Sequence, residues 1–322
     1  MKIIKHIRIL TILALTAAIA FGTTARAEHP DAFAPAMSIT VTTGFDEDDG
    51  YVGGGMGVSL REALTHAADG ATITIPAGVY TLDADSHSGI TVSSKVKIKG
   101  AGREHTIIDA GNNGRIITVS AGGHAEIQGI TFRNGKADRG GAILNEGALT
   151  LIDAGFVGNH AEDGGAIYTA GFTTVLGTMF ESNHASYLGG GICAVEADVL
   201  VSGTSFLKNT AHLGGGIYNR FSMLVLESTT LYGNLAGSGA GIKDYVGFTR
   251  VGSSSLAENF GGNFEGSFIS LGNNYEDDGS SGFTDGVNGD TVQRSAGTAY
   301  KRVTHSPCGD LCHNHREQQH RR

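Results

Sequence analysis

Gly140-Gly141-Ala142-Ile143 is the first copy of a short phrase that recurs through the middle of this 322-residue chain. The isoleucines of its five copies follow one another at intervals of 24, 25, 25 and 25 residues: Ile143, Ile167, Ile192, Ile217 and Ile242. A second phrase, in which phenylalanine or leucine precedes asparagine by three positions, keeps the same period: Phe156 to Asn159, Phe180 to Asn183, Phe206 to Asn209, Leu231 to Asn234 and Leu256 to Asn259. Two separate marks with one period identify a repeat protein.

Each repeat holds short β-type runs between glycines, such as 149–152 and 224–226, and none has the length of 3.6-residue periodicity that a helix needs. Leucine-rich repeats are excluded, because their Leu-x-x-Leu-x-Leu frame is absent. We therefore predict an all-β fold, a right-handed parallel β-helix (a pectate-lyase-like solenoid) with one coil per repeat. Irregular coils from Ala71 and regular coils to residue 262 would give about eight coils, roughly 40 Å at the spacing of paired strands.

Stacked coils place equivalent residues in columns, and no single coil can bury its apolar face alone. The isoleucines form one predicted inward column, and two further columns are Phe156, Phe180, Phe206, Leu231 and Leu256, and Val175, Val201, Leu226 and Val251. Because asparagine tolerates turn dihedrals and stacked amides hydrogen-bond to one another, an asparagine ladder is predicted at one bend. Its members are Asn134, Asn159, Asn183, Asn209, Asn234 and Asn259. Cys193, inside the repeat, is expected to be buried and reduced.

Residues 1–27 have the pattern of a cleaved secretory signal peptide, with an early basic segment, an apolar run and the small-x-small sequence Ala25-Arg26-Ala27. Its removal leaves 19 basic against 32 acidic residues, a net charge of −13. Such a chain is a poor partner for nucleic acid or anionic membranes. We expect a monomer without a stable transmembrane segment in the mature chain, secreted or on the outer cell surface.

Residues 28–70 are expected to hold an N-terminal strand, an acidic loop and a cap helix. Ser59-Leu60-Arg61-Glu62 has the capping-box pattern, and one apolar face follows at Leu60, Ala63, Leu64 and Ala67. The helix would cover the first coil, whose core and strand edge are otherwise exposed. The β-helix is assigned to residues 71–290, and residues 291–322 to a disordered or poorly packed tail.

The segment 58–64, Val-Ser-Leu-Arg-Glu-Ala-Leu, with the acidic stretch 42–50 before it, resembles the CSLREA motif of exported bacterial β-helix proteins. The Gly-Gly-Ala-Ile and Phe-x-x-Asn phrases resemble the repeats of chlamydial polymorphic outer membrane proteins. Residues 276–283 are similar to the segment that ends the helix in many CSLREA proteins. This resemblance, over about residues 40–290, implies a secreted or surface β-helix protein, and some members of these families are adhesins. The chain departs at Val58 and Ser281, where the family usually or often has cysteine, and the anchoring or autotransporter portion of relatives is not recognised in it.

Three hypotheses about the function stay open. The first is an adhesin-like interaction module that binds a glycan or protein, and the second is a polysaccharide lyase or glycoside hydrolase acting on an acidic polysaccharide. The third, a structural fragment of a larger autotransporter, is favoured by the family resemblance and opposed by the missing barrel. Either enzyme needs carboxylates gathered with a base or metal around one sugar. The acids of the coils are instead scattered as in solvated turns, so binding is favoured and no catalytic residue is assigned: Asp153, Glu162, Asp163, Glu181 and Asp198. A groove with several carboxylates beside an arginine or lysine would favour the enzyme.

Tyr168 and Tyr218 each follow a column isoleucine, so they would point outward, two coils apart on one face. With Arg220 and Asp244 they form a candidate glycan-binding strip, with Asn145, Asn219 and Lys243 nearby. The alternative is that they are ordinary surface tyrosines.

Other clusters contain metal-binding residue types. His160 and His184 follow adjacent ladder asparagines, with Thr210 next, and are predicted to form a polar column rather than a metal site. Calcium could bind the carboxylates of Asp46, Asp48 and Asp49, or of Asp277 and Asp278, although neither stretch matches a full calcium loop. No cofactor is therefore predicted, with calcium left open. Zinc-type ligands at a non-standard spacing lie in the tail: Cys308, Cys312, His313 and His315.

Overall fold

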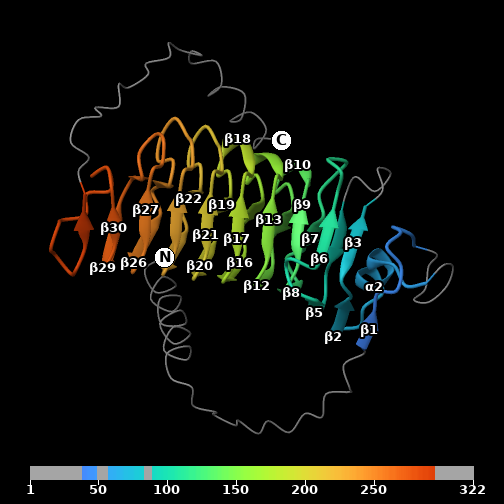
Figure 1. The fold of residues 1–322 in the computed structure, drawn as a ribbon. Coiled ribbons are helices and arrows are strands. Elements are labelled where there is room, and N and C mark those ends of the chain that lie inside the picture. The colour runs from blue at the N-terminus through green and yellow to red at the C-terminus, as the bar shows by residue number, and fades with distance from the viewer. Residues whose placement is uncertain (1–37, 49–56, 83–88, 294–322) are drawn as a thin grey trace, which may run out of the picture. The chain divides into compact units, whose positions relative to one another are not determined.

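The fold is seen in a computed structural model that describes residues 38–48, 57–82 and 89–293. Within these residues the strands form four sheets, and every strand pairs in parallel with its equivalent in the neighbouring coil. The chain is a right-handed parallel β-helix of about eight coils, as predicted (Figure 1). The predicted signal peptide, residues 1–27, lies outside the described residues.

The strands are grouped by sheet in the order in which the sheets begin along the chain. Sheet 1 contains β1 (Ser38–Thr40), β2 (Ala71–Ile75), β5 (Lys95–Gly100), β8 (His124–Gln128), β12 (Ala148–Ile152), β16 (Phe172–Leu176), β20 (Asp198–Ser202), β23 (Met223–Glu227), β26 (Phe248–Gly252) and β29 (Phe268–Gly272). Sheet 2 contains β3 (Gly78–Thr81), β6 (Thr106–Asp109), β9 (Thr131–Arg133), β13 (Gly155–Val157), β17 (Met179–Glu181), β21 (Ser205–Leu207), β24 (Thr230–Tyr232), β27 (Ser255–Ala257), β30 (Tyr275–Glu276) and β31 (Thr291–Val292).

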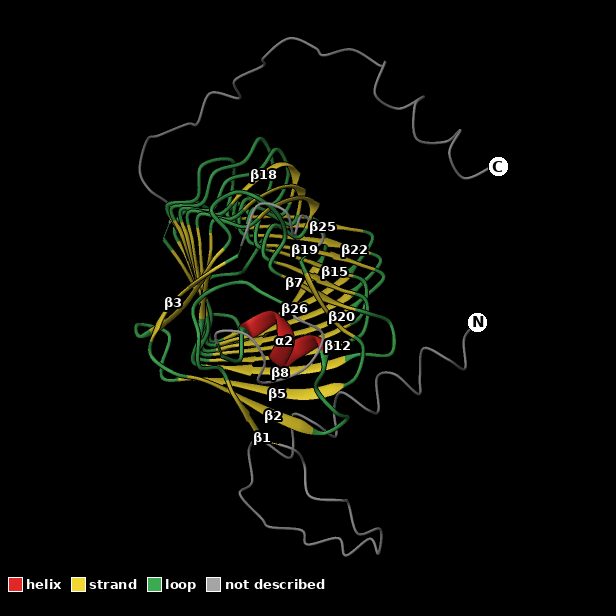
Figure 2. Cartoon of the chain, turned by 90° about the vertical axis from the view of Figure 1, so that its right-hand side faces the viewer, coloured by secondary structure: helices red, strands yellow, loops and turns green. Residues whose placement is uncertain are grey.

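Sheet 3 contains β4 (Ile90–Val92), β7 (Ile117–Val119), β11 (Ile143–Asn145), β15 (Ile167–Thr169), β19 (Ile192–Val195), β22 (Ile217–Arg220), β25 (Ile242–Tyr245) and β28 (Phe264–Glu265). Sheet 4 is short and contains β10 (Lys136–Arg139), β14 (His160–Asp163) and β18 (His184–Leu188). A regular coil runs through sheets 3, 1, 2 and 4 in that order, and Figure 2 looks along the stack.

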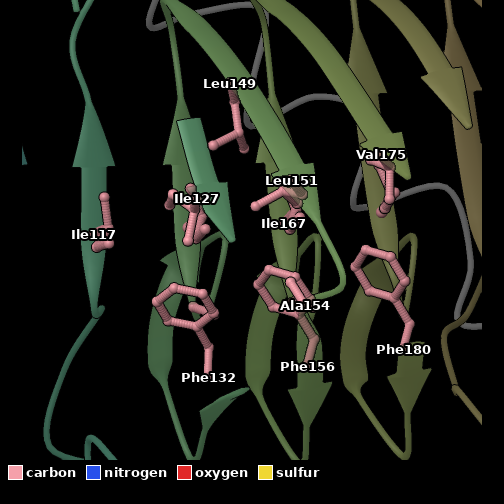
Figure 3. Close-up of a cluster of buried hydrophobic side chains, with 14 of the residues drawn as sticks. Ile117, Ile127, Phe132, Leu149, Leu151, Ala154, Phe156, Ile167, Val175 and Phe180 are labelled. Atoms are coloured by element: carbon pink, nitrogen blue, oxygen red, sulfur yellow. The ribbon is translucent and has the colours of Figure 1, made fainter. Parts of the chain in front are cut away.

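The interior consists of the predicted apolar columns. The isoleucines from Ile143 to Ile242 pair in register through five coils and are fully buried. The phenylalanine column begins one coil earlier than predicted, at Phe132, whose ring lies 5.3 Å from that of Phe156 between centroids. The rings of Phe156 and Phe180 are 4.8 Å apart and those of Phe180 and Phe206 are 4.7 Å apart, and both pairs are nearly parallel. Figure 3 shows the first three rings of the column, Phe132, Phe156 and Phe180. Stacked rings add about 0.5–1.5 kcal/mol per pair beyond their burial, so the columns link each coil to the next.

The asparagine ladder is confirmed for the five regular coils. The side-chain amide of each asparagine donates to the next asparagine's side-chain oxygen: from Asn159 to Asn183, Asn183 to Asn209, Asn209 to Asn234 and Asn234 to Asn259, at 2.9–3.0 Å. Each of these oxygens also accepts the backbone N–H of the preceding asparagine. The ladder thereby satisfies buried backbone groups at a bend where no strand can.

The assignment of Asn134 to this ladder is wrong. Phe132 pairs with Phe156, so the ladder position of this coil is Gly135, whose N–H donates to the Asn159 side chain at 2.8 Å. Asn134 sits one residue earlier, with a left-handed φ of 54°, and its amide donates to Asp109. It follows Phe132 by two residues rather than three, and this shift moves it from the ladder to the adjoining turn.

The predicted cap helix is present as α2 (Leu60–Thr65). Ser59 and Glu62 form the reciprocal capping box, and Leu60, Ala63 and Leu64 are buried. The helix packs against β2 and β4 at the start of the solenoid, as Figure 2 shows. None of the helices in the described part of the chain is long and apolar enough to cross a membrane.

The segment after β30 closes the other end of the solenoid. Phe283 is buried with its ring 4.7 Å from that of Phe268. Glu276 is buried, and it accepts hydrogen bonds from the N–H and hydroxyl of Ser281, the position at which the CSLREA resemblance gives cysteine. Burial, with Asp278 nearby, raises the pKa of Glu276 to about 8. Sheet 2 continues to β31, so strand pairing extends two residues beyond the predicted end of the β-helix at residue 290. Residues 294–322 of the predicted tail lie outside the described residues.

Replacement of one ladder residue tests the structural role of the stacked amides. Asn209→Ala removes the acceptor of two groups of Asn183 and the donor to Asn234. Because a buried polar group without a partner costs about 1–3 kcal/mol, we expect the free energy of unfolding to fall by about 2–4 kcal/mol in urea titrations. Asn134→Gly, which keeps the left-handed turn but lies outside the ladder, should cost less than about 1 kcal/mol. Equal losses in the two variants would contradict the ladder.

The buried carboxyl of Glu276 predicts a pH dependence of stability. Its pKa is about 8 in the folded chain against an ordinary value of 4.5, so the fold favours the protonated form. The resulting stability is fully present below the unfolded pKa and is lost as the pH rises through the folded pKa. The urea midpoint should therefore fall between pH 5 and pH 8.5, and Glu276→Gln should flatten that decline. Glu104→Gln, at an exposed carboxylate, should leave the decline unchanged.

Candidate binding site

The structure buries the tyrosines of the predicted glycan strip. Tyr168 and Tyr218 do lie in one column, on either side of Cys193, and they point away from the main core. They are only 9% and 5% exposed, because Leu188 of sheet 4 packs against them in a second apolar cluster. The expectation of an exposed tyrosine strip is therefore wrong.

Burial also fixes the ionisation of this second cluster. It raises the pKa of Tyr218 to about 12 and raises the pKa of the Cys193 thiol well above its usual range. Cys193 is buried and free, as predicted. A thiol held in its neutral form is a poor nucleophile, so no reactive role is assigned to Cys193. The cluster contributes to stability through the packing of Leu188 of sheet 4 on sheet 3.

Asp244 is also buried and supports a corner of the coil. One carboxylate oxygen accepts from Asn219 at 2.9 Å and from the Thr249 hydroxyl, and the other accepts the N–H of Gly247 at 2.7 Å. These bonds hold the turn between β25 and β26. Asn145, three coils before Asn219, is buried in a similar position and bonds to Thr169.

Of the four predicted site residues, Arg220 alone faces solvent, and it does so next to an exposed apolar surface at the corner between sheets 3 and 1. We call this surface the aromatic corner and define it by six residues: Arg220, Phe221, Tyr245, Val246, Phe248 and Arg250. The exposed fraction is 48% for Phe221, 52% for Tyr245, 69% for Val246 and 41% for Phe248. In-register pairing of Arg220 with Tyr245, and of the strands that follow, places them on two successive coils.

In the aromatic corner, two rings contact each other edge to face, and each arginine lies over the face of a phenylalanine ring. Phe221 and Tyr245 have centroids 6.3 Å apart and an interplanar angle of 73°. The guanidinium carbon of Arg220 lies 5.2 Å from the Phe221 centroid, and that of Arg250 lies 5.1 Å from the Phe248 centroid. Each such cation–π contact at an exposed site contributes about 0.5–1 kcal/mol, which favours this arrangement of the side chains.

The corner owes its shape to one additional residue. Thr169 pairs with Ala194, and Phe172 pairs with Asp198. Between these paired positions the earlier coil has two residues, 170–171, and the later coil has three, 195–197. The additional residue adopts a left-handed conformation in three successive coils: Glu196 at φ 54°, Phe221 at 50° and Val246 at 57°. A left-handed backbone costs an ordinary L-residue about 1–2 kcal/mol and is a genuine outlier for valine.

The sequence carries a signal for this additional residue that the repeat period hides. The interval from a column isoleucine to the next ladder asparagine is 16 residues from Ile143 and Ile167, and 17 residues from Ile192 onward. From Ile167 to Ile242 the period stays at 25, because the return from Asn209 to Ile217 is one residue shorter than the return from Asn183 to Ile192. The first interval, from Ile143 to Ile167, is 24 residues, because a return of eight residues there follows an interval of 16. Comparison of the two part-intervals would have located the insertion and, with it, Phe221 and Val246.

The apolar surface continues onto the last strand of sheet 1. Ile269 pairs with Arg250 across β26 and β29, and both Ile269 and Leu271 are nearly half exposed. The exposed apolar residues therefore span the coils from β22 to β29. A contiguous apolar surface of this kind on a folded protein marks an interaction site more often than a solvated face.

The predicted calcium ligands have protein partners. Asp46 forms a bidentate pair with Arg61 at 2.7 and 2.8 Å, and Asp48 lies 3.0 Å from His66. Asp277 accepts from Asn263 and from the Glu258 N–H, while Asp278 accepts from the Asn263 and Ser280 N–H groups. These contacts hold the two ends of the solenoid. The zinc candidates Cys308, Cys312, His313 and His315, together with Asp49, lie outside the described residues.

His160 and His184 form the predicted column on sheet 4. Their ring centroids are 5.8 Å apart, and His184 Nδ1 lies 2.7 Å from the Thr210 hydroxyl. Burial, followed by the neighbouring His160, lowers the pKa of His184. Across residues 38–48, 57–82 and 89–293, no group of three or more His, Cys, Asp or Glu side chains is arranged to hold a metal ion.

The described residues form a parallel β-helix with an exposed aromatic surface at one of its corners. No protein-family model and no curated protein matches the chain. Among solved structures it is similar to an alginate lyase of the PL6 family, at 12% identity and a TM-score of 0.43 over 85% of this chain and 41% of the lyase. It is also similar to a pectin methylesterase from carrot, at 14% identity and a TM-score of 0.36 over 83% of this chain and 88% of the esterase. The chain thus spans less than half of the lyase, and neither similarity reaches beyond the fold.

The strain at the aromatic corner can be measured as stability. Val246→Asn places a residue that tolerates the left-handed region at φ 57° and removes a side chain that is mostly solvated. We expect the free energy of unfolding to rise by about 1 kcal/mol, as judged from the urea midpoint. Leu235→Asn, at a similarly exposed residue outside the left-handed positions, should change stability by less than about 0.5 kcal/mol. A loss of stability in Val246→Asn would show that the valine packs against something that favours the fold.

Proposed function

We propose that this protein is an adhesin-like binding module that engages a glycan or another protein through the aromatic corner. The observation that carries the proposal is the presence of bulky apolar side chains, Phe221 and Val246, that face solvent from left-handed backbone positions. Neither the backbone conformation nor the exposure stabilises the fold. Strain of this kind persists at binding sites, where the surrounding structure holds it in place.

The composition of the aromatic corner supports binding. Tyrosine, phenylalanine and arginine are enriched at the centres of protein interfaces, and the residues that dominate binding energy are often tyrosine and arginine. Tyr245 and Arg220 stand next to each other on paired strands, above the buried Asp244 network. This network holds the corner in position before any ligand arrives, and such preorganisation lowers the cost of binding.

The setting proposed for this activity is outside the cell. Residues 1–27 have the pattern of an export signal, and the CSLREA and polymorphic outer membrane protein resemblances favour a secreted or surface-exposed β-helix. The alternative, a lyase or hydrolase acting on an acidic polysaccharide, would need carboxylates that face one sugar. Near the aromatic corner Asp244 is committed to Asn219, Gly247 and Thr249, which favours binding over cleavage.

The proposal predicts a loss of binding from the corner and from no other exposed aromatic surface. The purified protein is titrated against a panel of acidic and neutral polysaccharides and an array of extracellular proteins, with product release measured in parallel. Phe221→Ser with Tyr245→Ser should weaken binding at least tenfold, because hot-spot side chains each contribute 1 kcal/mol or more. Tyr187→Ser with Tyr232→Ser, at similarly exposed rings on other strands, should bind as the unmodified chain does. Equal binding by all variants, or the release of sugar products, would contradict the proposal.

A further inference from the structure

We infer that the ligand of the aromatic corner is a segment of another protein that carries carboxylates among apolar side chains. This inference rests on the proposed function and specifies its partner. It depends on three features of the corner: the faces of its rings, the aliphatic side chains around them, and two arginines that form no ion pair with the described residues.

The rings do not offer the flat platform on which a sugar stacks. One face of Phe221 is taken by Arg220 and one face of Phe248 by Arg250, at 5.2 and 5.1 Å. Tyr245 meets Phe221 at 73°, so their faces do not form one plane. The rings therefore present differently inclined surfaces rather than one plane, which suits the side chains of another protein better than the face of a pyranose.

The surroundings of the rings are aliphatic. Val246 is the most exposed apolar member of the corner, and Ile269 and Leu271 extend the surface along β29. Sugar hydroxyls placed over such side chains would lose hydrogen bonds to water without gaining partners. Apolar side chains of a protein would instead gain about 25 cal/mol for each Å² removed from water. The aliphatic part of the surface therefore also favours a protein.

The charge of the corner specifies what else the partner carries. The chain has 32 acidic and 23 basic residues, and some basic side chains of the described residues pair closely with acids, as in Lys243–Glu265 at 2.6 Å and Arg133–Asp109 at 2.7 Å. Neither Arg220 nor Arg250 forms an ion pair with any acid of the described residues. The Nε atom of Arg250 is buried and has no hydrogen-bond partner among the described residues.

A carboxylate is the group that best completes such an arginine. Guanidinium groups bind carboxylates through two parallel hydrogen bonds, and these bonds are about twice as strong as neutral ones. A second copy of this chain is less suitable, because a two-fold contact through the same surface brings its arginines towards one another. A protein segment with both apolar and acidic side chains is complementary to the apolar surface and to the guanidinium groups of Arg220 and Arg250.

The test uses an array of twelve-residue peptides in which phenylalanine, leucine or valine alternates with one polar residue. One series carries glutamate, a second carries glutamine and a third carries lysine. The full chain should bind the glutamate series about tenfold more tightly than the glutamine series, and the lysine series least. Added salt should narrow that difference, because exposed charge pairs are screened. The double variant Arg220→Ala/Arg250→Ala should lose the preference for glutamate while it retains apolar binding, and Arg103→Ala, distant from the corner, should retain the preference.

The outcomes separate this inference from the proposed function. Equal binding of the three series, lost in Phe221→Ser/Tyr245→Ser, would overturn the acidic partner and leave the binding site in place. Binding of polysaccharides but not peptides, lost in the same variant, would overturn the protein partner alone. Self-association that is abolished by this variant would identify a second copy as the occupant and would also overturn the inference. Binding that no corner variant changes would overturn both proposals.

Discussion

Coil-to-coil backbone pairing is the constraint on which the rest of this structure depends. Each strand finds its hydrogen-bond partners in the coils before and after it, so the coils must stay in register at the spacing of paired strands. Register turns sequence repetition into columns such as that from Ile143 to Ile242. At the bend between sheets 2 and 4, where ladders stop, the asparagine amides take over the same task. The fold is thus stabilised by contacts between neighbouring coils, which together form one continuous core along the solenoid.

Column membership was predictable because it depends on spacing alone. The isoleucine, phenylalanine and asparagine marks carry the period explicitly, and the capping box marks the helix through a local pattern. Asn134 shows the limit of this reasoning: a displacement of one residue moves a side chain from the ladder to a turn, and the residue type alone does not reveal it. The residue at the ladder position of this coil is Gly135, and a glycine gives no sequence signal for that position.

Exposure could not be predicted from spacing. The outward direction of Tyr168 and Tyr218 followed correctly from the alternation of strand residues, yet both are buried, because the segment after each ladder asparagine forms a fourth layer over sheet 3. That segment is short and rich in glycine, which is typical of a turn. Whether an outward side chain is exposed depends on which other segment packs over it. The residue pattern of one strand does not predict such a contact.

The aromatic corner follows from the same constraint. Since both flanking sheets keep their register, a residue can be inserted at the corner without disturbing any column, and the period changes only between 24 and 25 residues. The inserted position is therefore free to change from Glu196 to Phe221 to Val246 while the interior stays constant. Its left-handed backbone would favour glycine or asparagine if folding alone decided the residue. The bulky side chains found there instead are most simply explained by a requirement outside the fold, and this places recognition at the corners and stability in the columns.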